Sequence, residues 1–231
     1  MCFSMEASLV GGVIISAIGV VTVKKVHKSS QILFASIPLF FGLQQFAEGF
    51  LWYSLPNPDL QTIQNISAYT FVIMAQVIWP LLIPLSVLVM EKSAKKKKIL
   101  YIMFAFGVVL ALYYSFCLIS FAISPQIMGY HIKYFNSFPM SLAKPAFLFY
   151  LIATIPPFFV SSIKRMKLMG YLMTGSCVVT VIFFTQYLTS VWCFFAALLS
   201  GVIYWILNDS RRAFNLEKLR LLTQPIKDLL K

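Results

Sequence analysis

Seven apolar segments follow one another along the chain, each long enough or nearly long enough to cross a lipid bilayer as an α-helix. The hydrocarbon core of a bilayer takes about 20 mostly apolar residues of helix. The segments cover residues 8–23, 31–55, 67–90, 99–122, 144–163, 168–188 and 190–207. Only 11% of the residues are charged, whereas a soluble domain has about 25%. The sequence therefore predicts an all-α membrane protein, with residues 1–208 forming a bundle of seven transmembrane helices.

The charges between these segments predict the orientation of the bundle. The loops after the first, third, fifth and seventh segments carry 3, 5, 3 and 6 Lys or Arg residues, which is 17 of the 19 in the chain. Because Lys and Arg collect on the cytoplasmic side of membrane proteins, we expect the N-terminus outside and the C-terminus inside. The net charge of +12 is spread between apolar segments rather than over one soluble face. This distribution argues against a nucleic-acid partner.

The tail, residues 209–231, differs from the rest of the chain. Leucines alternate there with basic residues, Asp209 or Ser210 can cap a new helix, and Pro225 would interrupt that helix. A basic amphipathic helix of this kind suits the surface of an anionic membrane. We expect it to bind anionic lipid headgroups through Arg211, Arg212, Lys218 and Arg220.

The second segment contains the polar run Gln44-Gln45-Phe46-Ala47-Glu48-Gly49-Phe50-Leu51-Trp52. A carboxylate and two amides are costly inside a membrane, so they are expected to face the interior of the bundle and to mark a functional site. At helical spacing Gln44, Glu48 and Trp52 share one face, and Gln45 lies beside them. The alternative is structural: a protonated Glu48, hydrogen-bonded to Gln44 or Gln76, would hold helices together.

The expected topology brings further polar residues to the same outer half of the bundle. The predicted ligand-binding residues are Cys2, Glu6, Gln44, Gln45, Glu48, Trp52, Gln76, Trp79, Trp192 and Cys193. The tryptophans have a second interpretation, as packing residues or as part of the aromatic belt at the membrane interface. Cys2 and Cys193 are expected near each other at the outer surface, as a disulfide, as metal ligands, as reactive thiols or as ordinary small residues.

Three motifs give the chain a family resemblance. It opens with Met1-Cys2-Phe3-Ser4 followed by Ala7-Ser8, continues with Gln44-Gln45-x-x-Glu48-x-x-x-Trp52, and has Ser190-Val191-Trp192-Cys193 in its last segment. In these motifs it resembles an uncharacterised family of bacterial multi-pass membrane proteins that begin with MCFS-x-x-AS. The resemblance covers most of the chain. It implies a location in the bacterial inner membrane and implies no mechanism.

Three functions remain open from the sequence. The first is a protein that binds a small molecule or an ion in an outer-half pocket, for transport or for sensing. The second is an intramembrane enzyme that uses Cys2 or Cys193 as nucleophile and Glu48 as acid or base. The third is a structural subunit that binds a partner through its basic tail. The pattern names no cofactor and no metal.

Overall fold

The computed structural model describes residues 4–187, 191–192, 195 and 197–229, with the backbone alone for residues 186, 213 and 216–229. The described chain is mostly helical. Its α-helices are α1 (Met5–Val23), α2 (Ile32–Ser54), α3 (Gln61–Ile73), α4 (Trp79–Met90), α5 (Ala94–Ser120), α6 (Met140–Thr154), α7 (Pro156–Val160), α8 (Met166–Phe183) and α10 (Ser200–Leu229). Shorter elements are η1 (Ser29–Gln31), η2 (Pro58–Leu60), the π-helix η3 (Met74–Ile78), η4 (Thr185–Tyr187), and the strands β1 (Ile123–Met128) and β2 (His131–Asn136).

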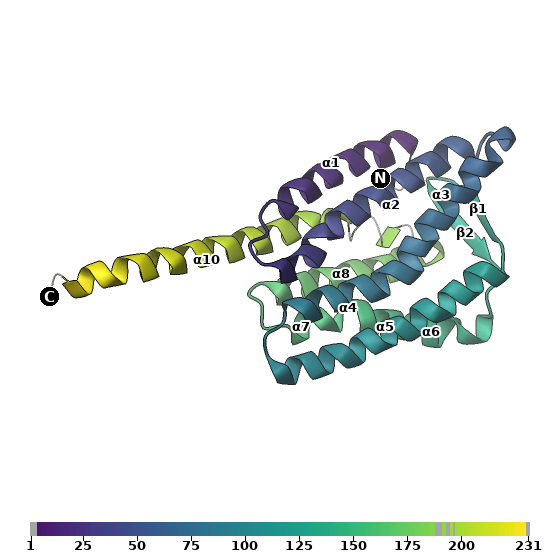
Figure 1. Cartoon of the computed structure of the whole chain (residues 1–231). Coiled ribbons are helices and arrows are strands. Elements are labelled where there is room, and N and C mark those ends of the chain that lie inside the picture. The colour runs from purple at the N-terminus through teal and green to yellow at the C-terminus, as the bar shows by residue number, and fades with distance from the viewer. Residues whose placement is uncertain (1–3, 188–190, 193–194, 196, 230–231) are drawn as a thin grey trace.

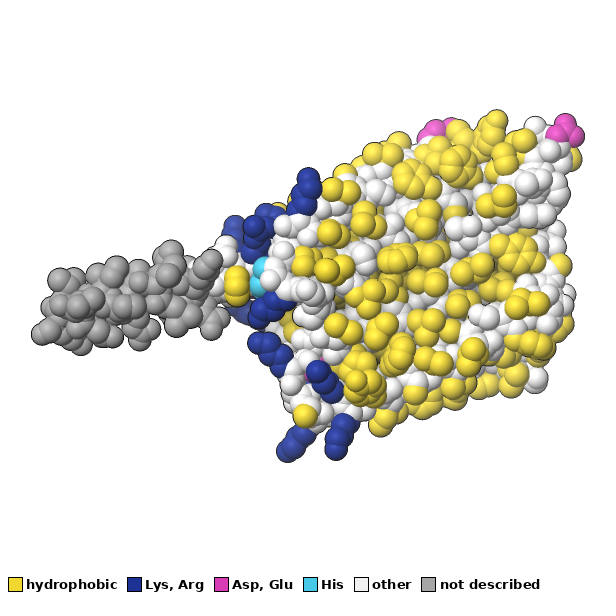
Figure 2. Space-filling model, in the orientation of Figure 1, with side chains coloured by type: hydrophobic (Ala, Val, Ile, Leu, Met, Phe, Trp, Pro, Cys, Tyr) yellow, Lys and Arg dark blue, Asp and Glu magenta, His cyan; other side chains and the backbone are white. Residues whose placement is uncertain are grey.

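Five helical segments are long and apolar enough to cross a membrane. They are Met5–Val23, Pro58–Met90, Ala94–Ser120, Met140–Val160 and Met166–Phe183. Helix α2 is not among them, since its two glutamines and its glutamate lower its hydropathy. Hydrophobic side chains cover the middle of the bundle, whereas Lys and Arg gather at the end from which α10 projects (Figure 2). This surface is typical of a protein that lies in a membrane.

Helices α1 and α2 pack very closely along a row of small residues. A Cβ atom added to Gly42 of α2 would lie 2.1 Å from the Ser16 Oγ atom of α1, and one added to Gly12 would lie 3.0 Å from the Phe46 ring. The small residues of α1 and α2 therefore lie against each other. Such faces let two membrane helices approach without large side chains between them. The opposite side of α2 remains for the interior of the bundle.

The segment from α3 to α4 contains an irregular turn just before Pro80. The Trp79 backbone N–H donates to the Met74 carbonyl, five residues back, which is the spacing of a π-helix. Since Pro84 has no N–H, it cannot bond to the Pro80 carbonyl. Gly107 of α5 lies against that carbonyl so closely that a Cβ atom at Gly107 would meet its oxygen at 1.9 Å. Proline and glycine together therefore set the contact between α4 and α5.

A β-hairpin covers one end of the bundle, at the side away from the tail (Figure 1). The sequence predicts only a long loop over residues 123–143, but β1 and β2 pair there as antiparallel strands. The Tyr134 ring stacks on the Phe71 ring of α3 with centroids 4.9 Å apart. The His131 ring of β2 packs 4.5 Å from the Tyr187 ring and is half-buried. The hairpin thus packs against α3 at the end of the bundle away from the tail.

Helix α10 runs without interruption from the bundle into the tail and projects away from it (Figure 1). The sequence predicts a new helix at Asp209 and an interruption at Pro225, and the structure has neither. Asp209 and Ser210 do not cap a helix because they bond to other parts of the chain. The Asp209 carboxylate lies 3.5 Å from Arg165 Nε, and Ser210 Oγ accepts a hydrogen bond from Gln31 Nε2 at 3.1 Å. These contacts tie the start of the tail to two loops at the basic end.

Glu91 joins two loops at the same end of the bundle. Its Oε1 atom accepts hydrogen bonds from the backbone N–H groups of Lys92 and Ser93 at 2.9 Å. Its Oε2 atom accepts one from the Ser162 N–H at 2.6 Å. Burial alone would raise the pKa of the Glu91 carboxyl, but the N–H donors of Ser93, Ser162 and Lys92 outweigh it and hold the pKa below its usual range. The loop after α4 is thereby fixed to the end of α7.

Candidate functional site

A polar stripe lies along α2 in the interior of the bundle. Gln44, Gln45 and Glu48 are all completely buried. At 100° per residue, Phe41, Gln45 and Glu48 fall within a narrow arc of α2 of about 60°. Gly42, which faces α1, lies outside that arc. Gly49, one turn after Gln45, also lies against α1, where a Cβ atom would come within 2.7 Å of the Leu9 side chain. Gln45 therefore borders the contact with α1, whereas Phe41 and Glu48 are turned further toward the remaining helices.

Gln44 connects α2 to the irregular segment between α3 and α4. Its Oε1 atom accepts a hydrogen bond from Trp79 Nε1 at 2.8 Å. Its Nε2 atom donates a longer bond, 3.5 Å, to the Phe71 carbonyl. The structure therefore brings together two of the predicted site residues, Gln44 and Trp79, and the bond between them fixes the Trp79 indole.

Gln45 has the same side chain as its neighbour and a different environment. Its amide oxygen and nitrogen are both buried, and neither has a hydrogen-bond partner in the part of the chain that the structure describes. An unsatisfied buried polar group costs about 1–3 kcal/mol. Such groups are uncommon in native proteins, and each one calls for an explanation, of which a water, an ion or a ligand at that point is one kind. Gln45 is therefore the strongest sign of a binding site in α2.

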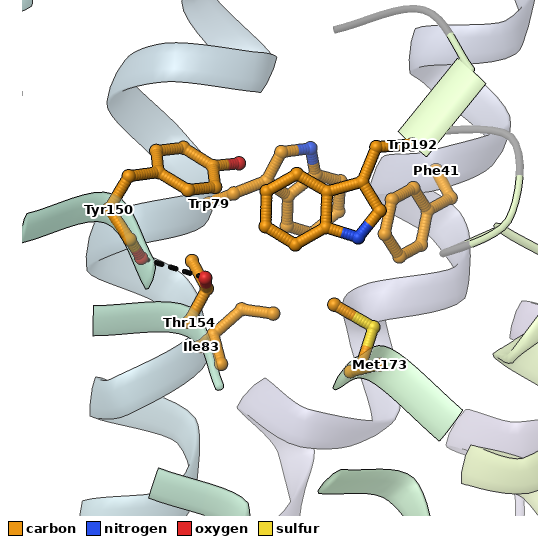
Figure 3. A pocket seen from close by; sticks show the side chains of 7 residues that line it. All are labelled: Phe41, Trp79, Ile83, Tyr150, Thr154, Met173 and Trp192. Atoms are coloured by element: carbon orange, nitrogen blue, oxygen red, sulfur yellow. Dashed lines mark hydrogen bonds between the residues drawn. The ribbon is translucent and has the colours of Figure 1, made fainter. Parts of the chain in front are cut away.

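An apolar cavity lies one helical turn from Gln45, beside Phe41. It is lined by Phe41, Trp79, Ile83, Tyr150, Thr154, Met173 and Trp192, and its empty volume is about 300 Å³ (Figure 3). Trp192 is only 6% exposed, and its indole Nε1 has no hydrogen-bond partner among the described residues. The cavity thus has an unsatisfied donor in its wall.

The cavity is narrow and almost without polar groups. Thr154 Oγ1 is already used, because it donates to the Tyr150 carbonyl at 2.7 Å (Figure 3). The space open to the centre of a water molecule is about 20 Å³, which is enough for about one water. A larger ligand therefore requires the lining side chains to move.

The other predicted site residues are placed less closely together. The Trp52 Nε1 and Gln76 Oε1 atoms are buried without a partner in the described ranges, although both residues are only half-buried. Glu6 is exposed on the first turn of α1. Cys2 and Cys193 lie outside the described residues, so their proximity and their role in an enzyme stay predictions. Among the residues that the structure describes, no group of three His, Cys, Asp or Glu could hold a metal ion.

Sequence reasoning missed most of the cavity wall. Phe41 precedes Gln45 by four residues, a spacing that could have placed it on the same stripe. Tyr150, Met173 and Ile83 give no such signal, because apolar residues are common throughout their helices. Their convergence depends on how the helices pack.

Two of the four predicted lipid-binding residues can be placed. Arg211 and Arg212 are exposed on α10, and Arg211 Nη1 also donates to the Lys24 carbonyl at 2.9 Å. The side chains of Lys218 and Arg220 lie outside the described part of the chain. The binding of lipid stays a prediction.

Part of the N-terminal motif has a structural explanation. Ser4 is the N-cap of α1, and its Oγ atom accepts a hydrogen bond from the Ala7 N–H at 3.2 Å. Ser8 is fully buried one turn later. The Ser4-x-x-Ala7-Ser8 spacing therefore fixes the start of α1 and its packing.

Comparison with known proteins gives one match. Residues 1–218 match the family of unknown function DUF6629. Neither curated proteins nor solved structures give a match. Since the match covers nearly the whole chain, the chain belongs to the DUF6629 family, a family of unknown function.

Proposed function

We propose that the chain is a seven-span protein of a bacterial inner membrane that binds a small ligand in the outer half of its bundle, for transport or for sensing. The observation that carries this proposal is the Gln45 amide, which is buried without a partner in the described ranges. The cavity beside Phe41 lies one turn away on the same stripe of α2. A ligand that bonds to Gln45 would remove the cost of burying this group.

The surroundings of Gln45 support binding rather than loose packing. The contact of α2 with α1 at Gly42 leaves no room for a side chain, and the bond from Trp79 to Gln44 holds the next helix in place. A binding site needs its groups held in position by residues that are themselves fixed. Gln45 therefore lies beside a rigid frame in which Gln44 and Trp79 are bonded to each other.

The distribution of charge supports the proposed orientation. Lys and Arg lie at the end where α10 leaves the bundle, and the opposite end carries acidic side chains (Figure 2). Reporter proteins fused after Lys95 and after Asn136 test the topology. We expect a cytoplasmic signal at Lys95 and an external signal at Asn136. A cytoplasmic signal at Asn136 would contradict the orientation.

Small molecules that copurify with the protein test the binding function. Wild-type protein and Gln45→Met are purified in parallel from native membranes, extracted and compared by mass spectrometry. Gln61→Met is the matched control, because Gln61 is exposed at the start of α3. We expect a molecule that copurifies with wild type and with the control and is depleted in Gln45→Met. The same extract from all three proteins would reject the proposal.

A further inference from the structure

We infer that the ligand of this cavity is an uncharged molecule with a flat apolar ring and an acceptor oxygen, such as a cyclic ketone, which accepts a hydrogen bond from Trp192 Nε1. This inference rests on the proposed binding function and names the chemical class of its ligand. Three features of the cavity lead to it: a donor in the wall that has no partner among the described residues, the aromatic lining and the absence of charge among the seven lining residues.

The donor is the Trp192 indole. Its Nε1 atom is buried, and within the residues the structure describes it has no partner. The nitrogen lies on the side of the ring toward Phe41, above Met173 (Figure 3). An indole N–H can only donate. The ligand must therefore present an acceptor, and a carbonyl oxygen is the usual acceptor on a neutral molecule.

The second tryptophan of the wall offers a different surface. Trp79 Nε1 is directed away from the cavity and donates to Gln44 (Figure 3). The Trp79 ring itself stacks on Phe41, with centroids 4.0 Å apart and planes inclined by 26°. Tyr150 and Trp192 form a second aromatic pair with centroids 5.3 Å apart. Aromatic rings favour offset stacking and edge contacts with other rings, so a flat ring suits this wall better than a branched chain.

The lining excludes a charged ligand. None of the seven residues that line the cavity is Asp, Glu, Lys, Arg or His. An anion would have one neutral donor from Trp192 and no counter-charge in the wall, and burying an unpaired charge is very costly. An aromatic wall can attract a cation through its ring faces. Here, however, the Trp192 N–H directs the positive end of its dipole at the ligand, which opposes a cation.

The dimensions of the cavity set the size of the ligand. The space open to the centre of a water molecule is only about 20 Å³, far below the roughly 300–1,000 Å³ of small-molecule pockets. A ring can therefore enter the cavity only when a lining side chain moves. Met173 is suited to this because methionine is flexible and adapts to irregular spaces. We therefore expect a ligand with one or two rings.

Three probes of similar shape distinguish a neutral ligand with an acceptor oxygen from a purely apolar ligand and from a cation. 1-Indanone has a flat bicyclic body with a carbonyl, indane lacks the carbonyl, and 1-aminoindane carries an ammonium group at neutral pH. Their binding to the full chain in lipid nanodiscs is measured by ligand-observed NMR. We expect 1-indanone to bind about fivefold to tenfold more tightly than indane, the difference that one neutral hydrogen bond makes. We expect 1-aminoindane to bind most weakly.

Two tryptophan variants show where the probe binds. Trp192→Phe removes the N–H and keeps a ring, so it should lower the affinity for 1-indanone to that for indane. Trp205→Phe is the control, because Trp205 is 44% exposed and packs against Arg165, away from the cavity. It should leave the affinity unchanged.

The failure of this inference differs from the failure of the proposed function. Equal binding of 1-indanone and indane, tighter binding of 1-aminoindane, or an unchanged affinity in Trp192→Phe would overturn the ligand class while the cavity remained a binding site. If none of the three probes bound to protein that is monodisperse and helical by circular dichroism, the ligand class would again be overturned, whereas the proposed function is decided by the molecules that copurify with wild type and with Gln45→Met.

Discussion

Gln45→Met removes a buried amide that has no partner in the described part of the chain and leaves a side chain of similar length. Gln44→Met is its matched control, because the neighbouring residue has the same chemistry and is equally buried. The two changes should act in opposite directions on protein from which small molecules have been washed. Gln45→Met should raise the thermal midpoint of unfolding, and Gln44→Met should lower it.

The magnitudes follow from the hydrogen bonds. Methionine at position 44 leaves Trp79 Nε1 without its acceptor at 2.8 Å. Hydrogen bonds between membrane helices contribute about 0.6–1.7 kcal/mol. Methionine at position 45 removes an unsatisfied group that costs about 1–3 kcal/mol. In a chain of this size about 1 kcal/mol shifts the midpoint by about 2–4 °C. Shifts of several degrees, with opposite signs, are therefore expected.

The assay is intrinsic tryptophan fluorescence during heating of detergent-solubilised protein, at one scan rate for all variants. Each variant is first checked for helical content and monodispersity. If Gln45→Met lowered the midpoint as much as Gln44→Met does, the Gln45 amide would be bonded within the native protein. No ligand would then be needed to satisfy the Gln45 amide.

Three further predictions concern other parts of the molecule. Gly107→Ala should lower the thermal midpoint by several degrees, since the new Cβ would meet the Pro80 carbonyl and overpacking costs about 1–3 kcal/mol. Gly175→Ala is the control and should be neutral or stabilising, because a Cβ there meets nothing within 4 Å. An equal loss of stability in both variants would refute this reasoning. Glu91→Gln should lower the thermal midpoint above about pH 5. The difference in midpoint from wild type should shrink as the pH falls through the pKa of Glu91, which lies below the usual value of about 4.3. A difference in midpoint that grew toward acid pH would contradict this prediction. A peptide of residues 209–224 should bind anionic vesicles in a sedimentation assay at low salt, with about 1 kcal/mol from each basic residue, and equal binding to neutral vesicles would speak against it.

The main helices could be predicted because their signal is local. A long apolar run between charged loops is sufficient to predict a helix, and the segments expected at 8–23 and 99–122 correspond to α1 and α5. The small-residue face of α1 could be recognised for the same reason. Its partner could not, because several helices were available to pack against it.

Features that depend on distant contacts were not predictable. The hairpin of β1 and β2 is held by the stacking of Tyr134 on Phe71, a pair that no local pattern connects. Helix α10 continues past Asp209 because Arg165 and Gln31, far away in sequence, occupy the groups that would otherwise cap a new helix.

The candidate site shows the same division between local and distant signals. The run from Gln44 to Trp52 could be singled out as a candidate site from its polar residues in an apolar segment. Which glutamine is bonded and which is not depends on the bond from Trp79 to Gln44, and adjacent residues with identical side chains cannot be separated from the sequence. The cavity wall combines side chains from several helices and becomes visible only when they pack.

An electron cryo-microscopy map of the full chain, prepared from native membranes in lipid nanodiscs, tests the binding site most directly. The account predicts non-protein density in the cavity beside Phe41, within hydrogen-bond distance of Trp192 Nε1 or of the Gln45 amide. A map in which the cavity is empty and the Gln45 amide is bonded to the protein itself would contradict it.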